Sequence, residues 1–401
     1  MKILVLNSGS SSIKFQLFDM SDTAVLAGGL VEKIGESTSQ LTYRKFKVGT
    51  ETDKHVFQQS IGDHSEGLSH IAALLLDEEK GAVKSSAEIA AVGHRVVHGG
   101  ERFSEPTIVT AEVMEELQKL SFLAPLHNPA NLQGIEIAAE VFKQATQVAV
   151  FDTAFHQTLP EFAYRFAIPK EYYAQHGLRV YGFHGTSHAY VSREAAKFLG
   201  IANDQFNAIT VHLGNGCSMA AIKDGKSVDV SMGLTPVGGL MMGTRSGDID
   251  PGLLLFLVEH LNMTGQEIDQ LLNKESGLKG LAGDNDLRNV MQQYDSGDPE
   301  AVLAVTMYVY RIKKFIGAYT AALGRVDAVV FTAGVGENSA AIRSLVCENL
   351  EVLGITLDEV RNKEKTSGAH AISASGSNVN VLVVPTDEEL EIAMQVRGII
   401  S

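Results

Sequence analysis

The chain has 401 residues, of which 45% are hydrophobic and 20% are charged, and its formal net charge is −15. A chain of this length usually forms two domains, because single hydrophobic cores stop growing below it. The acidic charge, with no evident basic patch, excludes a general nucleic-acid binder. The sequence contains no apolar run that would span a membrane and no recognisable signal peptide. With only two cysteines, Cys217 and Cys347, we expect a cytoplasmic protein without a disulfide framework.

Two hairpins of the same design lie about half a chain apart. The first joins predicted strands at residues 3–7 and 13–18 through a small polar loop. The second joins predicted strands at 208–213 and 219–222, and Asp-Gly at 224–225 predicts the next hairpin turn. The repetition favours two duplicated domains over two unrelated hairpins.

Strands alternate with helices along the rest of the chain, which is typical of α/β proteins. We expect strands over residues 89–97, 147–152 and 327–331, and helices over 111–120, 130–145, 251–261, 299–323 and 339–350. The polar stretches at 35–40 and 365–378 are expected to be loops.

Three loops rich in Gly, Ser and Asn follow predicted strands, at residues 7–12, 213–218 and 333–338. Small residues let backbone N–H groups approach phosphate oxygens, so the three loops together predict a phosphate site without a P-loop motif. Lys14 follows the first loop, where it either reaches a phosphate or is simply an exposed strand residue.

Two arginines are candidates for binding anions. If residues 92–97 form a strand, Arg95 and Val97 share one face, and a cation beside an apolar side chain suits a small carboxylate with a methyl group. Arg245 lies in a glycine-rich loop, where it either contacts a transferring phosphoryl group or forms a salt bridge with Asp248 or Asp250.

Two carboxylates are candidates for catalysis and metal binding. Asp152 ends an apolar strand, where it could orient a metal-bound water, act as a base or cap the next turn. Thr386 and Glu389 are spaced as a helix capping box, which leaves Glu388 to hold Mg²⁺ directly or through water.

Histidines gather in two of the glycine-rich segments. His184 and His188 have the spacing of a metal pair, but Gly185 is expected to break a helix between them, and the glutamate of a zinc-protease motif is missing. We therefore interpret His184 as a hydrogen-bond donor to a phosphoryl group, with a structural role as the alternative. The same pair of interpretations applies to His212, before the second loop.

Several long stretches, in family order over nearly the whole chain, resemble the acetate kinase family of the acetate and sugar kinase/Hsp70/actin superfamily. They are residues 6–14, 93–100, 124–129, 151–156, 181–188, 212–216, 242–251 and 331–338. The resemblance implies an α/β fold of duplicated ribonuclease-H-like (actin-like ATPase) domains, with ATP in the interdomain cleft. Residues 1–150 plus 386–401 would form the N-terminal domain, on the carboxylate side, with Mg²⁺ and phosphate contacts. Residues 151–385 would form the nucleotide-binding domain.

The resemblance also implies a role for each candidate residue. Asn7 and Glu388 would place Mg²⁺, with Mn²⁺ as an alternative, and Arg95 would bind the carboxylate. Asp152, His184 and Arg245 would be catalytic. The pocket for the methyl group would be formed by Val97, Leu126, Phe183 and Pro236. ATP would be bound by Lys14, His212, Leu213, Gly214, Asn215, Gly216, Asp286, Leu287, Arg288, Gly334, Val335, Gly336, Glu337 and Asn338.

The expected activity is reversible, in-line transfer of the γ-phosphoryl group of ATP to acetate, which gives ADP and acetyl phosphate. A propionate kinase with a larger pocket is the nearest alternative, because one methylene group provides only ~1–3 kcal/mol of discrimination. An alternative of another class is an actin-like or Hsp70-like ATPase without a carboxylate substrate. The family resemblance also implies a homodimer, whereas charge and hydropathy predict a protein that binds neither nucleic acid nor a membrane.

Overall fold

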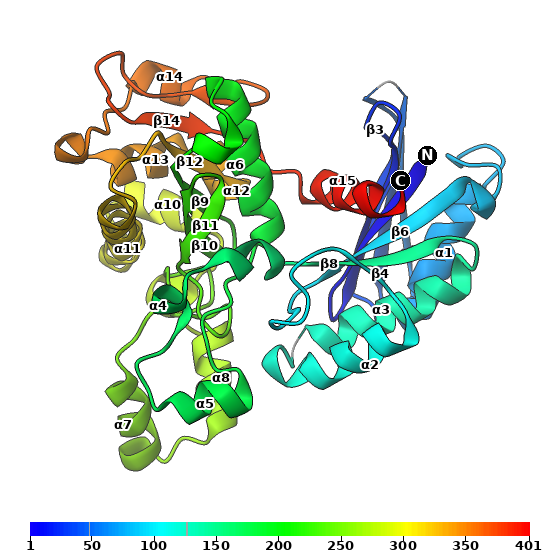
Figure 1. Ribbon diagram of the computed structural model, residues 1–401, viewed down its shortest axis with the longest axis horizontal. Helices are drawn as coiled ribbons and strands as arrows, with labels where there is room; N and C mark the ends of the chain where they lie inside the picture. The colour runs from blue at the N-terminus through cyan, green and yellow to red at the C-terminus, as the bar shows by residue number, and fades with distance from the viewer. Residues whose placement is uncertain (48, 126) are drawn as a thin grey trace. The chain divides into compact units, whose positions relative to one another are not determined.

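The computed structural model describes residues 1–47, 49–125 and 127–401, which divide into two compact units (Figure 1). Unit 1 comprises Met1–Ala154 and Asp387–Ser401, and unit 2 comprises Phe155–Thr386. The sequence-based prediction ended the first segment of the N-terminal domain at residue 150 and began its second segment at residue 386. No helix in the described ranges has the length and apolarity needed to cross a membrane.

Unit 1 is built on a mixed sheet with the strand order β5-β4-β3-β2-β1-β6-β8-β7. Its strands are β1 (Lys2–Ser8), β2 (Ser12–Asp19), β3 (Ala24–Glu32), β4 (Ser39–Lys47), β5 (Thr50–Gln59), β6 (Ile89–Val96), β7 (Thr107–Ile108) and β8 (Thr146–Phe151). β1 pairs antiparallel with β2 and parallel with β6, and β6 pairs parallel with β8.

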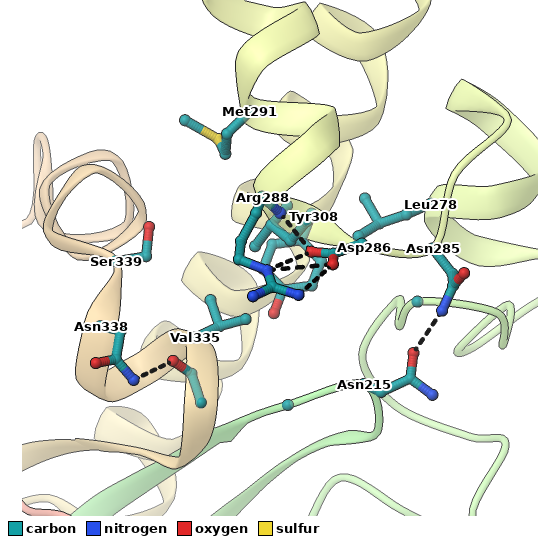
Figure 2. A pocket seen from close by; sticks show the side chains of 14 residues that line it. Asn215, Leu278, Asn285, Asp286, Arg288, Met291, Tyr308, Val335, Asn338 and Ser339 are labelled. Atoms are coloured by element: carbon teal, nitrogen blue, oxygen red, sulfur yellow. Dashed lines mark hydrogen bonds and ion pairs between the residues drawn. The ribbon is translucent and has the colours of Figure 1, made fainter. Parts of the chain in front are cut away.

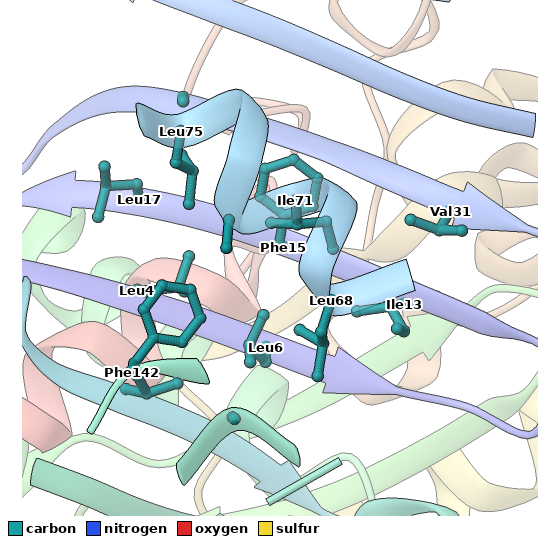
Figure 3. Packing of buried hydrophobic residues seen from close by; sticks show 14 of the residues in the cluster. Leu4, Leu6, Ile13, Phe15, Leu17, Val31, Leu68, Ile71, Leu75 and Phe142 are labelled. Carbon is teal, nitrogen blue, oxygen red and sulfur yellow. The ribbon is translucent and has the colours of Figure 1, made fainter. Parts of the chain in front are cut away.

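Helices cover both faces of this sheet, which explains why β1 is apolar at consecutive positions. The helical elements are α1 (His64–Leu76), η1 (Ser86–Glu88), α2 (Ala111–Lys119), η2 (Leu120–Leu123), α3 (Asn128–Val141) and α15 (Glu388–Ile400). Successive strand residues point to opposite faces. Leu4 and Leu6 therefore share a cluster with Ile71 of α1 (Figure 3), whereas Ile3 and Val5 share one with α15.

Close packing of α15 on the sheet requires a glycine in β6. A Cβ atom on Gly93 would lie 2.8 Å from Val396 Cγ2 and 2.9 Å from Ile392 Cγ2. Both distances are shorter than carbon–carbon contacts allow. The last helix of the chain thus completes the core of the unit that contains the first strand.

Unit 2 has a mixed sheet with the strand order β11-β10-β9-β12-β14-β13. Its strands are β9 (Ala208–Leu213), β10 (Cys217–Lys223), β11 (Lys226–Val230), β12 (Ala328–Thr332), β13 (His370–Ala371) and β14 (Asn380–Val383). β9 pairs antiparallel with β10 and parallel with β12, and β12 pairs parallel with β14. The series β11-β10-β9-β12-β14 therefore repeats β3-β2-β1-β6-β8 of unit 1 in order and direction, which confirms the predicted duplication.

The helical elements of unit 2 begin with η3 (Ala154–Thr158), which crosses the unit boundary. They continue as α4 (Glu161–Tyr164), α5 (Lys170–His176), α6 (Gly185–Leu199), η4 (Asn203–Gln205), α7 (Pro251–Leu261), α8 (Gly265–Lys274), α9 (Gly277–Ala282), α10 (Leu287–Asp295), α11 (Pro299–Leu323), α12 (Ala333–Asn338), α13 (Ala340–Cys347), η5 (Glu351–Leu353) and α14 (Glu359–Lys363). Helices α7 and α11 have the predicted bounds.

Several sequence-based elements need correction. The helix predicted over 339–350 ends at Cys347, and the predicted loops 35–40 and 365–378 overlap β4 and β13. The helix predicted over 130–145 ends at Val141, because Phe142 leaves helical geometry (φ −112°, ψ 60°) and buries its ring. The predicted loop 333–338 is the short helix α12. The buried guanidinium of Arg343 stabilises its C-terminal end, donating to the carbonyl oxygens of Gly336 at 2.8 Å and Glu337 at 2.9 Å.

Candidate active site

A buried ion pair lies where two parallel strands of unit 1 end. Arg95 of β6 donates from Nε to Asp152 Oδ1 at 2.9 Å and from Nη2 to Asp152 Oδ2 at 2.8 Å. Asp152 directly follows β8, and its side chain is only 2% exposed. Glu388 Oε2, at the start of α15, lies 3.5 Å from Arg95 Nη1. Although burial disfavours the charged guanidinium, Asp152 and Glu388 raise the pKa of Arg95, so it stays cationic.

This geometry gives Asp152 a positioning role. Both of its oxygens accept from Arg95, rather than capping the turn that follows. The bidentate contact fixes the plane of the guanidinium. It uses two of the five N–H donors of Arg95, and of the other three the two on Nη1 face Glu388 Oε2 at 3.5 Å.

Lys14 and the start of α15 differ from the sequence-based interpretation. Lys14 Nζ forms an ion pair with Glu389 Oε1 at 2.7 Å, and the lysine side chain is 53% exposed. The predicted capping box is wrong, because Asp387 caps α15 by accepting from the backbone N–H of Leu390 at 2.9 Å. The carboxylate of Glu389 is thus paired with Lys14.

Four buried or half-buried histidines form a cluster in unit 2. The rings of His184 and His212 stack with centroids 4.3 Å apart, and His188 contacts both His156, at 5.7 Å, and His212, at 6.2 Å. Both ring nitrogens of His188 are hydrogen-bonded, to Thr210 and Ser218. These bonds give His188 a structural environment rather than that of a metal ligand.

His184 is held in a strained backbone conformation at the start of α6. Its φ of 56° and ψ of 27° are left-handed, a region that costs a non-glycine residue roughly 1–2 kcal/mol. Gly185 begins the helix, so it does not interrupt one as predicted. A strained conformation of this kind persists only where the surrounding structure holds it, and such residues often occur at functional sites.

Arg245 has no carboxylate partner within ion-pair distance in the part of the chain that is described. Its Nη1 donates to the carbonyl oxygen of Pro236 at 3.2 Å. Asp248 instead accepts from the backbone of Gly239, and Asp250 caps α7. The salt-bridge alternative for Arg245 is therefore wrong, and burial lowers its pKa, with Cys217 opposing this only in part.

Gly216 lies where the side chains of His184 and Arg245 converge. A Cβ atom on Gly216 would be 3.5 Å from His184 Nε2 and 3.6 Å from Arg245 Nη1. A half-buried cation and a ring nitrogen beside bare backbone form an arrangement suited to phosphoryl oxygens.

A cavity of about 690 Å³ lies in the same unit, at the ends of β9 and β12 and beside α9, α10 and α11 (Figure 2). Its volume lies within the range of small-molecule sites. Asn285 Nδ2 donates to Asn215 Oδ1 at 3.4 Å and Asn338 Nδ2 donates to the carbonyl of Gly334 at 2.9 Å. Arg288 pairs with Asp286, the N-cap of α10.

Most of the predicted nucleotide residues line this cavity. They are Gly214, Asn215, Asp286, Leu287, Arg288, Gly334, Val335 and Asn338. The other predicted residues lie elsewhere: Lys14 in unit 1, His212 and Leu213 in β9, Gly216 beside His184, and Gly336 and Glu337 in α12.

Six further residues line the cavity without having been predicted, namely Gly243, Leu278, Asn285, Met291, Tyr308 and Ser339. Asn285 and Gly243 adjoin segments that the sequence did indicate. Tyr308 and Met291 lie on helices whose apolar periodicity is indistinguishable from that of core residues.

The residues predicted to surround the methyl group lie on both units. Val97 follows β6 in unit 1, where its backbone N–H donates to Asn131 Oδ1 at 3.1 Å. Phe183 is buried beside His184 in unit 2, and Pro236 contacts Arg245 there. Leu126 lies outside the described residues, and the pocket stays a prediction.

Among the described residues, no group of three or more His, Cys, Asp or Glu side chains has the arrangement of a metal site. Unit 1 offers hard oxygen donors in Glu388 and in Asn7, which is half-buried near the end of β1. So few protein donors fit Mg²⁺, which usually keeps several waters and binds chiefly through substrate phosphates.

Comparison with known proteins gives consistent matches over the full length. Residues 2–394 match the model of the acetokinase family. An acetate kinase of Oleidesulfovibrio alaskensis is 51% identical over all of both chains. The crystal structure of Porphyromonas gingivalis acetate kinase matches all of both chains with a TM-score of 0.93 and 48% identity. A propionate kinase from Francisella tularensis matches 98% of both chains with a TM-score of 0.92 and 42% identity.

Proposed function

The chain belongs to the acetokinase family, with its duplicated actin-like ATPase fold, and we propose that it transfers the γ-phosphoryl group of ATP to acetate, reversibly, giving acetyl phosphate and ADP. The observation that carries this proposal within the molecule is Arg245. It is half-buried beside His184 and Gly216, and no described carboxylate neutralises it. A protein maintains such a cation when an anionic ligand supplies the missing charge.

Arg95 binds the acceptor in the proposed reaction. Its N–H donors that do not contact Asp152 take up a carboxylate, and Asp152 holds the guanidinium in the required plane. The attacking carboxylate has no proton to lose, so Asp152 need not act as a general base. A positioning role through Arg95 agrees with the commitment of both its oxygens.

Arg245 and His184 stabilise the transferring group. In phosphoryl transfer, charge is spread over the equatorial oxygens, where a guanidinium and an imidazole N–H are effective donors. The nucleotide occupies the 690 Å³ cavity, where Asn215 and Asn338 present amide groups. Gly216 leaves room for the phosphoryl oxygens beside both catalytic side chains.

Kinases that use ATP generally need a divalent cation, and we propose Mg²⁺, with Mn²⁺ as a substitute. Asn7 and Glu388 would hold it, the latter as a carboxylate beside Arg95. When bound, the ion neutralises charge on the β- and γ-phosphates. Activity should vanish on chelation with EDTA and return when Mg²⁺ is restored.

The direct test is ADP formation by the purified protein with Mg-ATP and acetate, propionate, butyrate or no acceptor. We expect strong turnover with acetate and trapping of acetyl phosphate by hydroxylamine. A preference for propionate would keep the chemistry but change the substrate, which is the lesser alternative represented by the Francisella match. Equal ADP release with and without a carboxylate would refute the proposal and favour an actin-like or Hsp70-like ATPase.

A homodimer in the cytoplasm is also proposed. Helix α7 exposes five large apolar side chains, namely Leu253, Leu255, Phe256, Val258 and Leu261. Monomeric proteins rarely expose so many apolar side chains on one helix. A second copy of the chain would cover it. Light scattering after size exclusion should give twice the chain mass of 43.1 kDa, and a monomer at micromolar concentration would contradict this.

A further inference from the structure

A chain of buried hydroxyl and imidazole groups leads to Nδ1 of His184. Thr210 Oγ1 lies 2.7 Å from His188 Nδ1, and His188 Nε2 lies 2.7 Å from Ser218 Oγ. Ser218 Oγ then lies 2.9 Å from His184 Nδ1. The chain connects β9, α6 and β10, and Thr210, His188 and Ser218 are fully buried.

The direction of donation in this chain follows from the proton of Thr210. Its hydroxyl has one proton and two candidate acceptors, His188 Nδ1 at 2.7 Å and the carbonyl oxygen of Ala220 at 3.4 Å. A normal O–H hydrogen bond spans about 2.5–3.0 Å. The proton therefore goes to His188, whose Nδ1 accepts it.

Each later step follows from counting protons. Burial lowers the pKa of His188 well below its usual value, and the neighbouring His156 and His212 add to this, so the ring is neutral. A neutral imidazole has one N–H, which must then be on Nε2 and donate to Ser218. Ser218 accepts this hydrogen bond and donates its own single proton to His184 Nδ1.

We propose that Thr210, His188 and Ser218 are positioning residues that fix His184 as the neutral Nε2–H tautomer, with this N–H beside Gly216 and Arg245. The inference rests on the proposed phosphoryl transfer, in which that N–H donates to a phosphoryl oxygen. His184 then acts without a positive charge of its own. Of the two catalytic side chains, only Arg245 supplies a positive charge, while His188 and Ser218 fix the orientation of the His184 ring.

The groups around His184 support a neutral ring. It stacks at 4.3 Å on His212, and two imidazolium rings at this separation would repel each other. Arg245, whose Nη1 would lie 3.6 Å from the same Cβ position on Gly216, adds a further positive charge. His188, on the same helix, is neutral. His212 and Arg245 thus both disfavour a second proton on His184.

Neutron diffraction from deuterium-exchanged crystals at pH 7 tests the proposal without any substitution. We expect deuterium on Nε2 but not on Nδ1 of His184, and on the Ser218 hydroxyl directed at His184. His156 is an internal reference, because its Nε2 faces the carbonyl oxygen of Phe183 at 3.1 Å and must carry the proton. Deuterium on Nδ1 of His184, alone or with Nε2, would overturn the proposal.

Kinetics of two matched serine variants separate positioning from general packing. Ser218→Ala removes the donor to His184, and we expect kcat to fall about 10²-fold with little change in either KM. Ser227→Ala removes an equally buried hydroxyl, 2.8 Å from His156 Nδ1, and should keep wild-type kcat. Equal effects of the two substitutions, or unchanged kcat in Ser218→Ala, would refute the relay. Failure of the wild-type protein to phosphorylate acetate would instead refute the proposed function, whatever the tautomer.

Discussion

Replacing Arg245 by methionine should separate activity from stability. Methionine keeps an unbranched chain of similar length but removes the charge. Loss of one electrostatic contact to the transferring group typically costs about 10²–10³ in kcat, or ~3–4 kcal/mol. The folded protein loses one hydrogen bond, from Nη1 to the Pro236 carbonyl at 3.2 Å, worth about 1 kcal/mol. Because no described carboxylate compensates the half-buried cation, removing it also relieves a desolvation cost of similar size.

We therefore expect Arg245→Met to lose at least about 10² in kcat while its free energy of unfolding changes by less than about 1 kcal/mol. Arg95→Met is the matched control. It leaves the Asp152 carboxylate, 2% exposed, without its bidentate partner, which should cost about 3–5 kcal/mol of stability as well as activity.

The assay combines steady-state ADP formation with guanidinium unfolding followed by far-UV circular dichroism, since the chain has no tryptophan. Hydrogen exchange in β6 and β8 would assign the destabilisation of Arg95→Met to unit 1. Wild-type turnover in a folded Arg245→Met protein would refute the role of Arg245. Destabilisation as large as that of Arg95→Met would show that its charge serves the fold.

Two further predictions concern pH and the nucleotide cavity. Burial lowers the pKa of His94 and His156 from 6.5 to about 4, so unfolding takes up protons below pH 6.5. Their stabilisation is complete above that pH and is lost as pH falls towards 4, by up to about 3 kcal/mol each; equal urea midpoints at pH 7 and pH 5 would contradict this. Gly243→Ala would place Cβ 2.2 Å from Asn215 Oδ1, so we expect weaker ATP binding by calorimetry. Gly265→Ala, where a Cβ meets nothing within 4 Å, should bind normally, and normal ATP binding by Gly243→Ala would refute the inferred clash.

Periodicity and turn chemistry predicted much of the architecture. The regular apolar spacing in 251–261 and 299–323 gave the bounds of α7 and α11, and repeated hairpins gave the duplication. The strand β5 escaped prediction because it lies at the sheet edge and is largely exposed and polar. The helix α12 escaped because its glycines resemble a loop, and the arginine that stabilises its end, Arg343, follows only later in the chain.

The sequence predicted which residues belong to the candidate site, but not which of their side chains contact one another. Glycine-rich motifs indicated Asn215 and Asn338, which line the cavity. Arg95 was expected to bind a carboxylate, yet its pairing with Asp152 joins positions 57 residues apart in sequence, which no local pattern reveals. The hydroxyl group of Ser218, 34 residues from His184, was likewise an ordinary strand residue in the sequence.

The return of the chain to unit 1 at Asp387 has a consequence for biosynthesis. During translation, the sheet face formed by Ile3, Val5 and Val148 stays uncovered until all of unit 2 has been synthesised and α15 follows. A nascent chain on the ribosome thus exposes this apolar surface, which makes it a natural substrate for chaperones. Glu388 belongs to the same helix, so the carboxylate beside Arg95 is also synthesised near the end of translation. Premature termination before α15 would therefore yield an aggregation-prone and inactive product rather than a partly functional enzyme.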